Sequence, residues 1–243
     1  MKLTVIGFRG GYPGPDEAAS TYLLEKDNFK MVIDFGSGGL LKIQKYIHVT
    51  DIDAVVLSHY HADHVSDIGV LQHALIVEAQ LGRLKNKVSI YGHDKNIEEF
   101  NKLTDDYTLG IAYDPTRKLK IGPFEISFLK TVHPVPCFGM RITDGDKTIV
   151  YTADTSYQKE WIDFSKNAQL LIADTNLYEE QKDLDIGHMT STEAASIARD
   201  ANIETLIMSH LPQYGNNDDL ITEAQKIYEG EVLLAKEGLI WRG

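Results

Sequence analysis

The stretch Ser58-His59-Tyr60-His61-Ala62-Asp63-His64 follows directly after the apolar run Ala54–Leu57 and holds four potential metal ligands within six positions. Residues i and i+2 of an extended stretch point to the same side, so His59 and His61 can bind one ion together. Asp63 and His64 stand where the chain turns into a helix, and they can serve a second ion. Imidazole and carboxylate groups suit zinc, iron and manganese. A polar loop rich in histidine by chance is the alternative, but a metal site explains the spacing better.

Other strand-like runs also end in a histidine or an aspartate. Ser127–Val132 runs into His133, Thr148–Thr152 leads through one alanine to Asp154, and Thr205–Met208 leads through one serine to His210. Ligands carried at strand ends can meet at one edge of a sheet, where α/β proteins commonly keep their sites. The pieces AVVLSH and TLIMSH also echo one another, as two corresponding halves of a chain would.

Short apolar runs and helical periods alternate along the whole chain, which predicts one compact α/β domain over residues 1–243. The runs expected to be strands are Lys2–Phe8, Lys30–Phe35, Ala54–Leu57, Lys87–Tyr91, Phe124–Leu129, Lys147–Tyr151, Gln169–Ala173 and Glu204–Met208. One helix is expected after His64. A capping box at Thr190–Glu193 predicts the start of a second. A third is expected to end at Gly230.

Composition limits the classes of function. The formal net charge of −12 over 243 residues argues against a broad basic surface for long nucleic acid. The single cysteine, Cys137, excludes an internal disulfide and suits a reducing cytosol. No run approaches the roughly 20 apolar residues needed to span a bilayer. We expect a cytoplasmic protein without a membrane partner.

The His59–His64 run has the HxHxDH pattern and resembles the signature of the metallo-β-lactamase superfamily. Asp34-Phe35-Gly36-Ser37-Gly38 resembles the early aspartate–glycine turn of that family. His133, Asp154 and His210 match its third histidine, its bridging aspartate and its last histidine. The resemblance implies a four-layer αββα sandwich, the metallo-β-lactamase fold, with a dinuclear site at one edge of two packed sheets.

The resemblance also implies a ligand set for two divalent ions, with zinc the expected metal and manganese the alternative. The first ion would be held by His59, His61 and His133, the second by Asp63, His64 and His210, and Asp154 would bridge them. Asp34 would hold a ligand histidine through its distal N–H. A shared hydroxide would then attack the substrate in line.

Two further stretches resemble ribonuclease Z and related phosphodiesterases. They are the run from His133 to Arg141 and the run from Gly187 to Ala195, which is similar to a histidine–serine–threonine motif with methionine in place of serine. The segment Glu231–Ile240 resembles the closing strand pair of these proteins. The positions His133 and Asp154 are only 21 apart, which leaves no room for the family's tRNA-gripping arm.

We therefore expect hydrolysis of a small phosphate ester. Asp63 would orient the nucleophile, and His188 would contact the phosphate or protonate the leaving oxygen. The alternatives are a thioester or lactone hydrolase, a ribonuclease Z-like RNA endonuclease that takes its arm from a partner, and a binding module without activity. The resemblance also implies a homodimer.

Some tempting residues match no motif. His48, His73 and His93 are expected to be surface or hydrogen-bonded histidines rather than ligands. Cys137 is expected to be a small buried apolar group. For Arg141, packing beneath the site and contact with substrate are both open.

Overall fold

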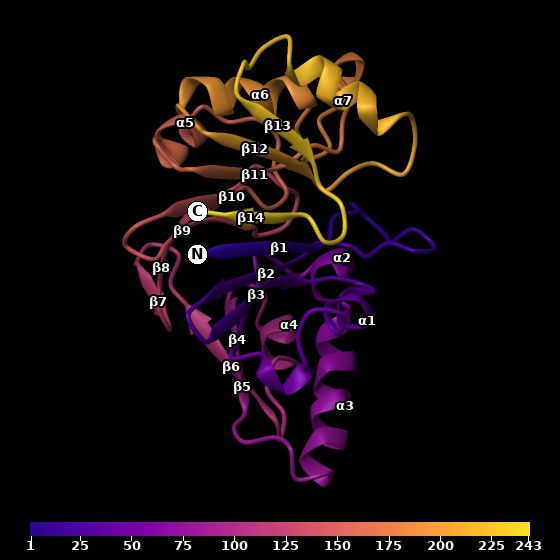
Figure 1. The fold of residues 1–243 in the computed structure, drawn as a ribbon, viewed down its shortest axis with the longest axis vertical. Helices are drawn as coiled ribbons and strands as arrows, with labels where there is room; N and C mark the ends of the chain where they lie inside the picture. Colours follow the sequence, from indigo (N-terminus) through magenta and orange to yellow (C-terminus); the bar gives the residue numbers. More distant parts are fainter. The chain divides into compact units, whose positions relative to one another are not determined.

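Fourteen strands form two mixed sheets of seven strands each (Figure 1). The structure is a computed structural model that describes residues 1–243. The first sheet belongs to a unit made of Met1–Asp114 and Lys236–Arg242, and the second to a unit made of Pro115–Ala235 and Gly243. The expectation of a single domain over 1–243 stays a prediction.

The first sheet has the strand order β14-β1-β2-β3-β4-β5-β6. Its strands are β1 (Lys2–Gly7), β2 (Thr21–Lys26), β3 (Phe29–Phe35), β4 (Ala54–Val56), β5 (Val88–His93), β6 (Thr108–Tyr113) and β14 (Ile240–Arg242). Strands β14 and β1 to β3 pair antiparallel, whereas β3 to β6 pair parallel. The three residues of β4 are all buried and apolar, as expected of a central parallel strand covered on both faces.

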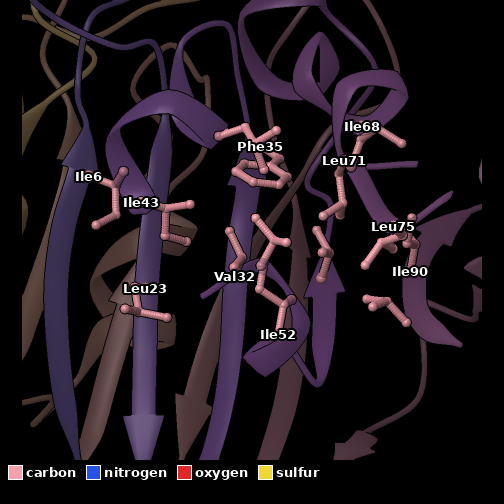
Figure 2. Close-up of a cluster of buried hydrophobic side chains, with 14 of the residues drawn as sticks. Ile6, Leu23, Val32, Phe35, Ile43, Ile52, Ile68, Leu71, Leu75 and Ile90 are labelled. Atoms are coloured by element: carbon pink, nitrogen blue, oxygen red, sulfur yellow. The ribbon is translucent and has the colours of Figure 1, made fainter. Parts of the chain in front are cut away.

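Helices of the first unit cover its sheet with an apolar core (Figure 2). They are α1 (Gly39–Ile43), η1 (Val49–Asp51), α2 (Ala62–Val65), α3 (Asp67–Gln80) and α4 (Ile97–Asn101), of which η1 is a 3-10 helix. Leu71 and Leu75 of α3 are fully buried against a cluster that includes Phe35, Ile43 and Ile90. Each such leucine stabilises the fold by about 1.5–3 kcal/mol relative to an exposed one. This packing fixes α3, which continues from the predicted metal-binding run.

The second sheet has the strand order β13-β12-β11-β10-β9-β8-β7. Its strands are β7 (Leu119–Ile121), β8 (Phe124–Lys130), β9 (Phe138–Thr143), β10 (Thr148–Tyr151), β11 (Leu170–Asp174), β12 (Thr205–Ser209) and β13 (Glu231–Leu234). Strands β7 to β10 pair antiparallel and β10 to β13 pair parallel. The parallel half ends its strands at a common edge, where Asp174 and Ser209 lie opposite one another.

Helices α5 (Glu160–Ser165), α6 (Ser191–Asp200) and α7 (Asn217–Ala224) lie beside this parallel half, and a short 3-10 helix, η2 (Glu179–Gln181), precedes α6 (Figure 1). The predicted capping box starts α6: Glu193 donates its backbone N–H to the Thr190 hydroxyl, and Thr190 donates its own N–H to the Glu193 carboxylate. None of the helices has both the length and the apolar composition of a membrane-spanning segment.

All eight runs expected to be strands form strands, with ends shifted by a few residues. The helix expected to reach Gly230 is shorter, because α7 ends at Ala224. The N–H groups of Ile227 and Tyr228 both bond the Ala224 carbonyl, and the Tyr228 hydroxyl bonds the Ile203 carbonyl at 2.7 Å, which turns the chain away. A Cβ at Gly230 would lie 2.0 Å from the Tyr228 hydroxyl oxygen. A glycine at this position therefore leaves space for the Tyr228 side chain and does not end a helix.

The closing segment also differs from the expectation. Strands β13 and β14 do not pair with each other: β13 pairs with β12 in the second sheet, and β14 pairs with β1 in the first. In the link Lys236–Leu239 between them, the Gly238 N–H donates to the Val5 carbonyl, and the Leu239 carbonyl accepts from the Val5 N–H. The first sheet therefore gains its edge strand from the far end of the chain.

Candidate metal centre

The turn after β4 carries the first cluster of donors. His59 is fully buried and His61 half-buried, and their ring centroids lie 4.7 Å apart. Their ligand atoms lie within 4.8 Å of one another, as do those of Asp63 and His64. His61 is extended, with φ −67° and ψ 149°, and it directly precedes α2. The run thus provides donors first from an extended stretch and then from the first turn of a helix, as its spacing predicts.

Asp34 organises this cluster from the end of β3. Its fully buried carboxylate accepts hydrogen bonds of 2.7 Å from the Ser58 N–H, the Ser58 hydroxyl and Nδ1 of His64. Because the carboxylate of Asp34 accepts a hydrogen bond from Nδ1 of His64, the proton of His64 lies on Nδ1 and the lone pair lies on Nε2. An imidazole in this form can bind a metal through Nε2. The predicted role of Asp34 in holding a histidine is confirmed at His64.

Ser58 links Asp34 to His59 and fixes the proton of that ring in the same way. Its hydroxyl donates its hydrogen to Asp34, so its oxygen accepts from Nδ1 of His59, which lies 3.0 Å away. The lone pair of His59 is therefore also on Nε2. Ser58 was not singled out from the sequence, although the serine shared by AVVLSH and TLIMSH was a signal.

Asp63 is held by a loop from the start of the chain. Its Oδ2 accepts a 2.7 Å hydrogen bond from the N–H of Gly11 and lies 3.5 Å from Nε2 of His64. Gly11 has φ 73°, which a residue with a side chain rarely adopts. Gly36 supports Asp63 from behind, because a Cβ there would lie 1.9 Å from the Asp63 carbonyl oxygen. The two glycines thus allow the backbone to approach Asp63 closely.

The second unit gathers the remaining predicted ligands. Nε2 of His133 lies 3.8 Å from Oδ2 of Asp154, and Nδ1 of His210 lies 3.1 Å from Oδ1 of the same carboxylate. All three side chains are at most 5% exposed. Nδ1 of His133 lies 3.1 Å from the Gly187 carbonyl and donates to it, which again leaves the lone pair on Nε2.

His188 lies against this second cluster and has a partner that sequence reasoning missed. Oδ2 of Asp174, at the end of β11, accepts from Nδ1 of His188 at 2.8 Å and from the Thr155 N–H at 3.0 Å. The His188 ring stacks on that of His210, with centroids 5.1 Å apart. Asp174 follows the rule that acids and histidines end these strands, so a signal existed.

Backbone strain gathers at the same positions. Six residues other than glycine have positive φ, and three of them are Asp34 (51°), Ala153 (52°) and His210 (55°). His210 is a predicted ligand, Ala153 precedes the predicted ligand Asp154, and Asp34 bonds the predicted ligand His64. The other three are asparagines or an aspartate, which tolerate this region best. Strain kept at buried strand ends is typical of functional sites.

The structure decides the role of Arg141. Its guanidinium donates to the carbonyls of Phe164 and Lys166 at the end of α5, at 3.0 and 3.3 Å. Burial lowers its pKa. Arg141 therefore packs against α5.

The other residues set aside also have structural roles. Cys137 is buried, with its thiol 3.6 Å from the Asp154 carbonyl. His93 is buried and accepts from the Lys95 N–H, whereas His48 and His73 are exposed.

Each unit thus holds its share of the predicted ligands in one cluster of histidine and aspartate donors, which is the chemistry of a divalent metal site. The assignment of individual ligands to individual ions stays a prediction.

Comparison with known proteins agrees with this chemistry. Residues 33–211 match the family model described as the beta-lactamase superfamily domain. The probable metallo-hydrolase YhfI of Bacillus subtilis is 50% identical over 244 residues, covering 100% of both chains. Its crystal structure superimposes with a TM-score of 0.98 at 49% identity, covering 100% of this chain and 99% of that one.

Two further relatives are more distant. Ribonuclease Z of Haloarcula marismortui is 23% identical over 297 residues, covering 98% of this chain and 96% of the relative. A diphosphatase of the PhnP family shares the fold, with a TM-score of 0.80 at 16% identity over 100% and 97% of the two chains. The metallo-β-lactamase fold implied by the motifs is confirmed, and the chain belongs to the metallo-β-lactamase superfamily.

Proposed function

We propose that this protein is a metal-dependent hydrolase that uses two divalent cations, zinc with manganese as the alternative, to cleave a small phosphodiester. One observation carries the metal-dependent part of the proposal. His59, His64 and His133 each have Nδ1 bonded to an acceptor within their own unit, so each presents the lone pair of Nε2. Histidines that bind metals are held in this way by a partner on the other ring nitrogen.

The proposed ligand set is the one implied by the motifs. His59, His61 and His133 would hold one cation, Asp63, His64 and His210 the other, and Asp154 both. Two such cations would supply a nucleophile at neutral pH and neutralise charge on the phosphoryl oxygens. Asp63, whose Oδ2 is fixed by the Gly11 N–H, would orient the attacking group.

His188 is proposed to protonate the leaving oxygen. The bond from its Nδ1 to Asp174 fixes the orientation of the ring, and a positioned imidazole can act as a general acid. The side chain is 16% exposed, so a substrate atom can reach it. The N-terminus of α6 follows directly and favours an anion nearby.

Three observations support a small phosphodiester: one favours phosphoryl chemistry, and two favour a small substrate. Relatives over nearly the whole chain are named ribonuclease Z and diphosphatase, names that denote phosphoryl chemistry. The short interval from His133 to Asp154 and the net charge of −12 support a small substrate over a long nucleic acid.

The test starts from protein stripped of metal by a chelator and reloaded with Zn²⁺ or Mn²⁺. Bis(p-nitrophenyl) phosphate is compared with a thioester, a lactone and precursor tRNA. We expect hydrolysis of the phosphodiester that disappears with the metal and returns with it. Faster turnover of the thioester or lactone would replace the proposed substrate class, cleavage of precursor tRNA would restore the nuclease alternative, and equal activity without metal would refute the proposal.

A further inference from the structure

Tyr60 lies between two predicted ligands in the chain and is tied to a neighbouring strand. Its hydroxyl donates a 2.6 Å hydrogen bond to the carbonyl of His93, the last residue of β5. Its ring also meets the ring of His93 edge to face, with centroids 4.6 Å apart. Alternate residues of an extended stretch point to opposite sides, so an anchor on Tyr60 fixes the backbone from which His59 and His61 project.

A second tyrosine holds the same turn two residues before His59. The Tyr113 hydroxyl, at the end of β6, donates a 2.9 Å hydrogen bond to the Leu57 carbonyl. The His93 ring meets the Tyr113 ring as well, with centroids 6.3 Å apart and planes at 84°. Both distances fall in the range of attractive edge-to-face pairs.

Packing alone does not fix the Tyr60 ring. A cavity of about 240 Å³ adjoins it, lined in part by Val65, Ile68 and Leu103. The ring therefore has room to turn once its hydroxyl bond is lost. The hydroxyl itself fits only because position 92 is glycine, since a Cβ at Gly92 would lie 2.4 Å from it.

We propose that Tyr60 and Tyr113, with His93 against both rings, form an aromatic clamp that holds the turn Leu57–His61 in the conformation that binds a metal. The clamp residues are positioning residues: they act through the backbone of His59 and His61. This inference rests on the proposed metal site and adds to it three residues that none of the motifs names as a ligand.

Removing a single hydroxyl tests the clamp. Tyr60→Phe and Tyr113→Phe keep each ring and delete one hydrogen bond. Tyr228→Phe is the matched control, because Tyr228 is buried and its hydroxyl bonds the carbonyls of Ile203 and Glu204, which precede β12, whereas the predicted ligand His210 follows the other end of that strand. The readouts are the affinity of metal-free protein for Zn²⁺, by competition with a chromophoric chelator, and the urea midpoint of the metal-free protein.

We expect each of the two clamp variants to bind Zn²⁺ about tenfold more weakly, the usual cost of losing a group that positions a ligand. Tyr228→Phe is expected to lower the urea midpoint of the metal-free protein about as much as each clamp variant does. It is expected to leave the Zn²⁺ affinity unchanged. Wild-type affinity in both clamp variants would overturn the inference, as would an equal loss of affinity in the control. A wild-type protein that binds no Zn²⁺ would instead refute the proposed function beneath it.

Gly92→Ala tests the clamp without removing a tyrosine hydroxyl. The added methyl group displaces the Tyr60 hydroxyl, so we expect weaker Zn²⁺ binding even though every tyrosine is intact. In the double variant with Tyr60→Phe the displaced hydroxyl is already absent, and only the contact of the added methyl group with Cδ1 of Leu103, at 2.8 Å, remains, so the two losses should add only in part. Full additivity would show that Gly92 acts apart from Tyr60 and would count against the clamp.

Discussion

Replacing Asp34 by asparagine removes one charge and keeps the shape of the side chain. Three donors converge on this carboxylate: the Ser58 N–H on Oδ1, and the Ser58 hydroxyl and Nδ1 of His64 on Oδ2. An asparagine keeps one accepting oxygen and turns the other into a donor. The substitution does not strain the backbone, because asparagine adopts the φ of 51° found here as readily as aspartate does.

The magnitude follows from how the amide can be placed. With its oxygen at the position of Oδ2, asparagine keeps two bonds as neutral ones and loses the bond to the Ser58 N–H. With the opposite placement it loses two bonds. At least one charge-assisted bond is lost in a fully buried place, so we expect a loss of about 2–3 kcal/mol in the free energy of unfolding.

Metal binding is expected to suffer separately. With the amide oxygen at the position of Oδ2, the bond from Nδ1 of His64 becomes a weaker neutral one, and with the opposite placement the amide hydrogen moves the histidine's own proton to Nε2, so in either case we expect weaker Zn²⁺ affinity, by about 10- to 100-fold. Urea unfolding followed by the fluorescence of the fully buried Trp161 measures the first effect, and chelator competition measures the second. The control is Asp53→Asn, whose carboxylate accepts only the exposed Lys30 N–H among its hydrogen bonds. Wild-type stability and affinity in Asp34→Asn would refute the assigned network.

Three other changes probe separate parts of the molecule. His188→Ala is expected to lower turnover about 10²- to 10⁴-fold while bound metal, measured by elemental analysis, stays the same, since general acid catalysis contributes that much; loss of metal would make it a ligand. Burial alone would raise the pKa of Glu237, but hydrogen bonds and ion pairs with Lys45 and Lys42 bring it below 4.5. The interactions of Glu237 therefore stabilise the fold above about pH 4.5, and this stabilisation is lost as the pH falls through the lower pKa that Glu237 has in the folded state. Glu237→Gln should therefore make the stability of the protein depend less on pH in the acid range. Gly139→Ala would place a methyl group 2.2 Å from the indole of α5, and we expect about 1–3 kcal/mol of destabilisation in urea.

The parts of the fold that could be predicted are those determined by local chemistry. Buried parallel strands such as β4 and β12 must be apolar throughout, and a capping box such as Thr190–Glu193 marks a helix start on its own. The HxHxDH run could be interpreted from the sequence as a metal site because a polar loop that is rich in histidine by chance does not explain the spacing of its side chains. Each of these signals lies within about ten residues. The strands and the helix start were confirmed, whereas the binding of metal by the HxHxDH run stays a prediction.

The parts that could not be predicted depend on contacts distant in sequence. Asp174 gains a role only because His188, 14 residues later and beyond the end of the strand, places Nδ1 against it. The end of α7 is set by the bond from Tyr228 to Ile203, which no helical period reveals. Arg141 was undecided for the same reason, because its partners are backbone carbonyls, which look alike in every sequence.

The attachment of β14 to β1 has a consequence for how the protein is made. Residues 236–242 complete the first sheet, so the edge of β1 has no cover while the ribosome is still adding the second unit. An uncovered strand edge is a template for wrong pairing between nascent chains. The unit that is synthesised first is thus the last to be finished, because its sheet waits for residues 236–242.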